Sequence, residues 1–174
     1  MQKSLVYLAA ALVFTFSRCL AASGPGDLPR PTNYVSDFAH VLSPHAVEQI
    51  NRACAQLDHS DANTQIAVVT ISSLNGSDIA EYARDLGNLW GIGKKESNRG
   101  VVVLLAINDR KWRIEVGLGL ERVLTNSKAE EIGEKMIPQL KANDFDEAIR
   151  IAVSQIAQTV STEAARPAVR IPGE

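Results

Sequence analysis

Residues 100–121 read GVVVLLAINDRKWRIEVGLGLE, and this stretch decides the fold. Its first half, Val101 to Ile107, is apolar without interruption, which is typical of a strand buried on both faces of a sheet. Turn-forming residues interrupt the run from Asn108 to Arg110. Apolar and charged residues then alternate from Trp112 to Val116, as in a strand with one buried face. The stretch therefore predicts a β-hairpin whose first strand is central and whose second strand lies at an edge.

A second apolar strand is expected ahead of the hairpin, at Gln65 to Ile71. Between the two strands, an apolar face from Ile79 to Trp90 predicts a helix, with Ser77 or Asp78 as its N-cap. Strand, helix and strand in this order form a right-handed crossover, so the two strands should be parallel neighbours. The second hairpin strand adds an antiparallel edge, and the sheet is predicted to be mixed.

Three further helices complete the predicted fold. Ser43 and Pro44 start the first one as N-cap and first helical residue. Another should start at Asn126 or Ser127, because Ser127 and Glu130 have capping-box spacing. The last helix carries an apolar face from Phe145 to Val160. Helices on both faces of a small mixed sheet predict a three-layer α/β/α sandwich.

Length, charge and the N-terminus indicate an exported single-domain protein. The 174 residues with a formal net charge of −2 fit one domain and lack the basic surface that nucleic-acid binding requires. Residues 1–22 have the pattern of a secretory signal, so we expect a periplasmic or secreted protein; an uncleaved N-terminal anchor is the alternative. Residues 23–31 are predicted to be a linker, 32–160 the folded domain and 161–174 a disordered tail. No transmembrane helix is expected in the mature chain.

Three aspartates are candidates for a metal site. The C-terminal ends of parallel strands share one edge of a sheet, where ligands usually bind in open α/β folds. Asp37, Asp78 and Asp109 are all expected at this edge, and their carboxylates are oxygen ligands of the kind that Ca²⁺ and Mg²⁺ prefer. The simpler alternative is that Asp78 caps a helix and Asp109 shapes a turn.

Other polar residues give weaker signals. Arg110, Glu121 and Asn126 are considered for a phosphate site or a second polar cluster. Gly117 and Gly119 do not make a dinucleotide motif, because an arginine replaces the third glycine, and they are expected to allow a tight turn. No serine lies in a nucleophile elbow. The only cysteine beyond the signal segment is on the apolar face of the first helix and is expected in the core.

Ordered blocks of the chain resemble the TPM domain family. They are YVSDFAHVLS at 34–43, QIAVVT at 65–70, WGIG at 90–93, NRGV at 98–101, DRK at 109–111 and RIEVGLGLE at 113–121. The family includes a thylakoid-lumen protein of photosystem II repair and many exported bacterial proteins. The resemblance covers residues 30–160. It implies an α/β/α fold, divalent-cation binding through acidic loop residues, and acid-phosphatase activity.

The chain departs from the family pattern in two places. The family usually has aspartate after Leu124 and Thr125, whereas this chain has Asn126, whose amide oxygen can bind a cation but carries no charge. Many bacterial relatives also have a C-terminal membrane helix and a Gly/Ser-rich tail. This sequence shows neither, so membrane anchoring of that kind is not expected.

Two functions are consistent with these residues. The first is an extracytoplasmic module that binds Ca²⁺ or Mg²⁺ and acts by association, as an accessory to envelope or membrane protein complexes. The second is a metal-assisted acid phosphatase, in which a cation at Asp37 and Asp109 would activate water while Arg110 pairs with the phosphate. The first is favoured, because a hydrolase should show an evident general base or nucleophile, and none stands out in the sequence.

Overall fold

A four-stranded mixed sheet forms the middle layer of the protein. The structure is a computed structural model that describes residues 24–28, 30–31, 33–93 and 96–165. The strands are β1 (Val35–Asp37), β2 (Gln65–Ile71), β3 (Gly100–Ala106) and β4 (Lys111–Val116), in that order across the sheet. The pairs β1–β2 and β2–β3 are parallel, whereas β3 and β4 are antiparallel.

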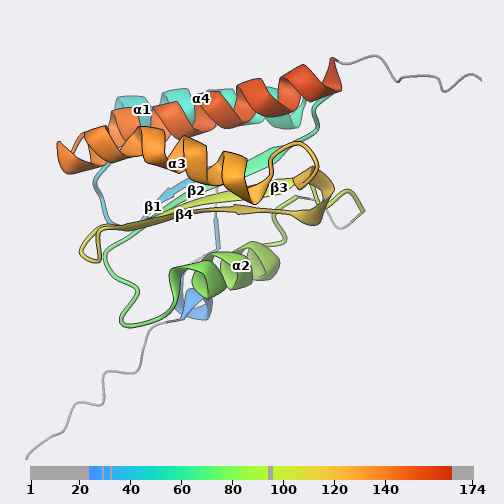
Figure 1. Ribbon diagram of the computed structural model, residues 1–174. Helices are drawn as coiled ribbons and strands as arrows, with labels where there is room; N and C mark the ends of the chain where they lie inside the picture. Colours follow the sequence, from blue (N-terminus) through green and yellow to red (C-terminus); the bar gives the residue numbers. More distant parts are fainter. Residues whose placement is uncertain (1–23, 29, 32, 94–95, 166–174) are drawn as a thin grey trace, which may run out of the picture.

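Helices cover both faces of this sheet. Figure 1 shows α1 (Pro44–Asp58), α3 (Asn126–Lys141) and α4 (Phe145–Ala164) on one face and α2 (Ile79–Trp90) on the other. The three-layer α/β/α sandwich with a small mixed sheet is therefore confirmed. The two long apolar strands are its inner strands, as their lack of polar alternation predicts.

The sheet separates two hydrophobic cores. Val101 and Val103 of β3 contribute to the core under α1, α3 and α4, and Val102 and Leu104 contribute to the core over α2. Every residue of β3 is buried, because successive side chains enter opposite cores. The expected core cysteine, Cys54, is 0% exposed, and burial raises the pKa of its thiol to about 12, so it stays protonated and unreactive at neutral pH.

Polar side chains set the helix starts. Ser43 and Asp78 act as N-caps of α1 and α2, as expected. The predicted start of α3 at Asn126 is confirmed, but its predicted capping box is wrong: the hydroxyl of Thr125 accepts the N–H of Lys128 at 3.2 Å. Thr125 has the extended backbone that an N-cap needs, whereas Ser127 already lies within the first turn.

Strand β1 was not expected from the sequence. Its three residues pair with Val68, Val69 and Thr70 of β2. Three residues are too few to show the alternation by which strands are recognised. The strand places Asp37 at the C-terminal edge of the sheet, beside Thr70.

The boundaries of the domain differ from the predicted ones. Within the expected linker, Pro25–Asp27 form a short 3-10 helix, η1, and Leu28 packs against the core over α2. At the other end α4 continues to Ala164, beyond the expected limit at residue 160. This last turn is exposed, so no apolar face in the sequence reveals it. Within it, the Thr162 hydroxyl donates to the Gln158 carbonyl at 2.7 Å.

The predicted signal segment, residues 1–22, and the end of the predicted tail, residues 166–174, lie outside the described residues. Export therefore stays a prediction. None of the helices in the described part of the chain combines the length and apolar character needed to span a bilayer.

Packing between β4 and α3 gives a stability prediction. A Cβ atom on Gly133 would lie 1.9 Å from two ring carbons of Trp112, so Gly133→Ala must displace the ring. We expect a loss of about 1–3 kcal/mol in the free energy of unfolding, although alanine favours helix more than glycine does. Urea denaturation measures it.

The matched control is Gly87→Ala in α2, where the added Cβ would lie 3.2 Å from a methyl group of Val102. This side chain can shift by a few tenths of an ångström, so we expect a change close to zero. Equal stability of the two variants would contradict the packing of Trp112 on α3.

Candidate functional site

The three candidate aspartates all lie at the C-terminal edge of the parallel strands. Asp37 is the last residue of β1, Asp109 follows β3 in the hairpin turn, and Asp78 is the N-cap of α2 after the loop that leaves β2. The topology thus brings them to the edge expected from the sequence. Their individual contacts decide what each can do there.

Asp37 holds the connection between β1 and α1. Its Oδ1 atom accepts the hydroxyl of Thr70 and the N–H of Val41, the latter at 3.2 Å. Its Oδ2 atom accepts the N–H of Leu42 at 2.9 Å. The Thr70 oxygen also accepts the N–H of Ala39 at 3.2 Å. Each carboxylate oxygen has two lone pairs, so these contacts leave acceptor capacity on Asp37.

Asp109 joins the hairpin turn to the loop after β2. Its Oδ2 atom accepts the N–H of Leu74 at 2.8 Å, and the N–H of Asn108 donates to the carbonyl of Ser72 at 2.9 Å. The Leu74 N–H is the main cause that lowers the pKa of Asp109, helped by the Ser73 hydroxyl and the charge of Lys111. The carboxylate is therefore ionised and fixed at the rim.

Asp78 has the role of a helix cap. One oxygen accepts the N–H groups of Ala80 at 2.9 Å and Glu81 at 3.0 Å. The bond from Glu81 is the main cause that lowers the pKa of Asp78, with further help from Ala80 and from the charges of Lys111 and Arg113. The structural roles considered for Asp78 and Asp109 are thus both present.

The three aspartates share an edge without forming one cluster. The charge of Lys111 helps to lower the pKa of both Asp78 and Asp109, so the same ammonium group acts on these two carboxylates. Asp37 belongs to β1, two strands away from β3, and neighbouring strands are about 4.8 Å apart. Among the described residues, no group of three or more Asp, Glu, His or Cys is close enough together to hold a metal ion.

The second set of candidates is divided between the two ends of β4. Arg110 precedes this strand, whereas Glu121 follows it, after the short 3-10 helix η2 (Leu118–Leu120). A strand of six residues is about 20 Å long. Asn126 begins α3, on the Glu121 side of the sheet. The structure therefore does not bring Arg110 together with Glu121 and Asn126.

At this opposite edge the glycines allow close backbone contact. The N–H of Gly117 donates to the carbonyl of Gly100 at 2.8 Å, and that of Gly119 donates to Asn98 at 3.1 Å. A Cβ on Gly119 would lie 1.9 Å from the carbonyl oxygen of Ser97. The glycines thus fasten the segment after β4 to the loop before β3, a role beyond the tight turn expected from the sequence.

Sequence reasoning missed Thr70. This residue is polar yet 0% exposed, and its hydroxyl links Asp37 to the β1–α1 loop. The available signal was a single threonine inside the apolar run of β2. A hydroxyl buried at the end of a strand needs a partner, and Asp37 is that partner.

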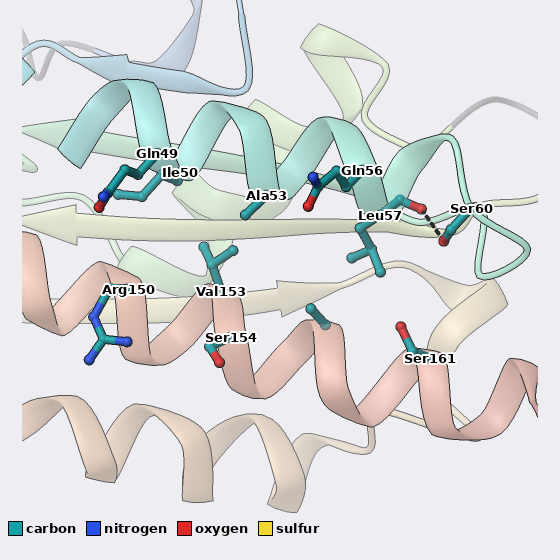
Figure 2. A pocket seen from close by; sticks show the side chains of 11 residues that line it. Gln49, Ile50, Ala53, Gln56, Leu57, Ser60, Arg150, Val153, Ser154 and Ser161 are labelled. Carbon is teal, nitrogen blue, oxygen red and sulfur yellow. Dashed lines mark hydrogen bonds between the residues drawn. The ribbon is translucent and has the colours of Figure 1, made fainter. Parts of the chain in front are cut away.

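A cavity of about 480 Å³ lies between α1 and α4, and none of the three aspartates lines it. Figure 2 shows Gln49 and Arg150 toward one end and Ser60 and Ser161 toward the other. Arg150 is paired with Glu147, and the Ser60 hydroxyl donates to the Leu57 carbonyl at 2.8 Å. The residues that line this cavity include no carboxylate or imidazole, so it offers no acid–base group.

A second cavity, of about 400 Å³, lies at the same edge as the aspartates. It is formed by the hairpin turn, the start of β4 and the connection between α3 and α4. Its lining combines aromatic and aliphatic side chains with cationic ones: Ile107, Arg110, Lys111, Trp112, Ile137, Leu140, Lys141, Asn143 and Phe145 are among them. The sequence did not reveal this cavity, because its lining comes from segments about 30 residues apart.

Comparison with known proteins identifies the family and the fold. The model of the TPM domain family matches residues 35–159. A solved N-terminal domain of a protein from P. gingivalis is 25% identical to this chain, with a TM-score of 0.75. The match covers 83% of this chain and 96% of that domain. The N-terminal domain of cg2496 from Corynebacterium glutamicum is 17% identical, covers 82% and 88%, and has a TM-score of 0.62.

A third solved structure, the BA42 protein of Bizionia argentinensis, is 15% identical, covers 70% of this chain and 82% of its own, and has a TM-score of 0.60. At this identity and that of the C. glutamicum domain, the likeness shows the fold alone. No curated protein matches the chain.

The lowered pKa of Asp109 predicts a pH dependence of stability. A carboxyl whose pKa falls below the ordinary 3.8 on folding stabilises the protein above that pH, and this contribution disappears as pH falls through the lowered pKa. Asp109→Asn keeps an oxygen for the Leu74 N–H but removes the charge. The variant should therefore be less stable than the original chain at neutral pH, and the difference should shrink as the pH falls below 3.8 and through the lowered pKa.

Urea denaturation of the variant and the original chain, at neutral pH and at a pH well below 3.8, measures the difference in stability. Asp85→Asn, which removes an exposed carboxylate from α2, controls for the change in net charge. An equal difference at both pH values would show that the charge of Asp109 adds nothing to its contact with Leu74.

Proposed function

The chain belongs to the TPM domain family, and we propose that it is a cation-binding module that acts outside the cytoplasm by association with other proteins. The cation is Ca²⁺ or Mg²⁺, and its site is at the C-terminal edge of β1–β3. Asp78 and Asp109 supply the first carboxylates. Asp37, farther along the same edge, contributes through the remaining lone pair of its Oδ2 atom or through a water molecule.

One observation carries the proposal: backbone N–H groups fix the carboxylates of Asp78 and Asp109 at the rim, and the charge of Lys111 acts on both. The ammonium group thus serves as their built-in counter-ion. A divalent ion with two charges can compete with it for the same carboxylates. Because Ca²⁺ also accepts backbone carbonyls and water, two carboxylates at a loop suffice for a weak site, with a Kd of about 10⁻⁴–10⁻³ M as in other extracellular modules.

Action by association rests on the family and on the predicted signal in residues 1–22. An exported module of this size reaches envelope or membrane protein complexes directly. Weak cation binding suits an accessory role, because the occupancy of such a site follows the free cation concentration outside the cytoplasm.

A metal-assisted acid phosphatase is the second candidate. One feature favours it: Arg110, next to Asp109, has a left-handed backbone with φ 51°, a conformation that is uncommon for a residue with a long side chain and that occurs at functional sites. Its guanidinium could pair with a phosphate beside the cation. A general base is harder to assign: His45 and His59 both bind groups of α1 itself, and His40 lies in the exposed loop after β1, two strands away from the β3 end that carries Asp109. Association is therefore the better supported function.

Calorimetric titration with Ca²⁺ and Mg²⁺ tests the cation site. Asp78→Asn and Asp109→Asn keep their oxygen acceptors but lose a charge, so each should weaken binding by about tenfold. Lys111→Gln should strengthen it, because the competing counter-ion is removed. Lys141→Gln makes the same change in charge at the end of α3 and should have little effect.

Unchanged affinity in both asparagine variants, or no effect of Lys111→Gln, would place the cation elsewhere. Asp37→Asn, measured in parallel, decides whether that residue takes part. Hydrolysis of p-nitrophenyl phosphate separates the two functions: turnover that survives repurification and disappears in Asp109→Asn would favour the phosphatase.

A further inference from the structure

The cavity of about 400 Å³ beside the hairpin turn has the size and chemistry of a ligand site. Ligand pockets commonly have volumes of about 300–1,000 Å³, and an apolar cavity of about 150 Å³ already holds a benzene molecule. The walls of the cavity include Trp112, Leu140 and Phe145, which are packed against the core but only partly buried. Part of the apolar surface of these three side chains is therefore accessible from the cavity.

Two cations flank this apolar surface. Arg110 comes from the hairpin turn and Lys141 from the end of α3, and both side chains are exposed. Within the described parts of the chain, neither one takes part in an ion pair. Lys111 also lines the cavity, but its charge acts on Asp78 and Asp109, toward α2.

The acidic residues around the cavity are engaged elsewhere. Asp109 binds the N–H of Leu74. Asp144 caps α4 through the N–H of Glu147, at 3.1 Å, and Asp146 accepts the N–H of Ser43 at 2.9 Å. None of these carboxylates lines the cavity. The charged side chains that do line it, Arg110, Lys111 and Lys141, are all cationic.

Both loops that form the opening are held in shape by backbone hydrogen bonds. The N–H of Arg110 donates to the carbonyl of Ile107 at 3.2 Å, and the N–H of Asn143 donates to that of Leu140, also at 3.2 Å. Arg110 and Asn143 have left-handed backbones, with φ of 51° and 58°. A cavity shaped by such turns exists before the ligand arrives, which lowers the entropic cost of binding.

We propose that this cavity binds a small amphipathic anion. A carboxylate or phosphate group of the ligand pairs with Arg110 and Lys141, and its apolar body of one or two rings lies against Trp112 and Phe145. The site is distinct from the proposed cation site, because Asp78 and Asp109 are directed to the α2 side of the sheet. Either site can therefore fail without the other.

Tryptophan fluorescence tests this proposal. The chain has two tryptophans, and Trp90 lies in the opposite core with its ring 6.3 Å from that of Phe38. Trp90→Phe therefore leaves Trp112 as a reporter at the cavity. This protein is titrated with 3-phenylpropanoate, with phenylphosphonate, which cannot be hydrolysed as a phosphate ester, and with the uncharged 3-phenylpropan-1-ol.

We expect saturable changes in Trp112 emission with at least one of the two anions, and binding of the alcohol weaker by about tenfold or more. The better anion identifies the preferred head group. Calorimetry on the chain with both tryptophans checks that Trp90→Phe has not altered the site. No saturation with either anion, or equal affinity for the alcohol, would overturn the proposal.

Charge variants locate the binding site. Arg110→Asn removes the charge and tolerates the left-handed backbone, and Lys141→Gln removes the second charge. Each should weaken anion binding by about fivefold or more, and the double variant should lose it. Lys128→Gln, an equal change on the same helix as Lys141 but away from the cavity, should bind normally. Normal binding by the double variant would refute the assignment, provided that its circular dichroism shows a folded protein.

Discussion

Burial of β3 on both faces is the constraint on which the rest of the structure depends. All of its residues are buried, and its alternate side chains enter two different cores. Helices must therefore cover both faces of the sheet, and a neighbouring strand must satisfy the backbone on each side. β2 and β4 do this, one parallel and one antiparallel. The C-terminal end of β3 is consequently fixed between two layers, and the turn that follows it stands at the edge where the loops of both layers meet.

The aspartates at this edge have a structural role before any ligand is considered. Asp37 and Asp109 each bind backbone N–H groups of a neighbouring loop, and Asp78 binds those of its own helix. Charge-assisted hydrogen bonds of this kind fix the carboxylates in position, and they lower the pKa of Asp78 and Asp109. A carboxylate that is already oriented loses less entropy on binding a cation than a mobile one does. Loop anchoring and weak cation binding are thus compatible uses of the same residues.

The sequence predicted the layers, the inner strands and the hairpin, because long apolar runs and periodic faces are local patterns. It also placed the three aspartates at the correct edge, since parallel strands share one. It could not show β1, whose three residues have no period, nor the cap of α3, where Thr125 and Ser127 are both chemically suitable. The spacing of the aspartates across the edge depends on strand order, which places β1 two positions from β3. The link between Asp37 and Thr70 is likewise a product of that pairing.

The hairpin turn separates opposite charges that are adjacent in the sequence. Asp109 reaches the loop after β2, on the way to α2, whereas Arg110 lines the cavity beside α3 and α4. In an extended segment, neighbouring side chains also point to opposite sides. Here Arg110 has a left-handed backbone, and β4 begins at the next residue. If the two charges were on one side, each would compete with an ion for the other. The left-handed turn at Arg110 thus stands where the two charges part, with Asp109 bound to the loop after β2 and Arg110 in the lining of the cavity.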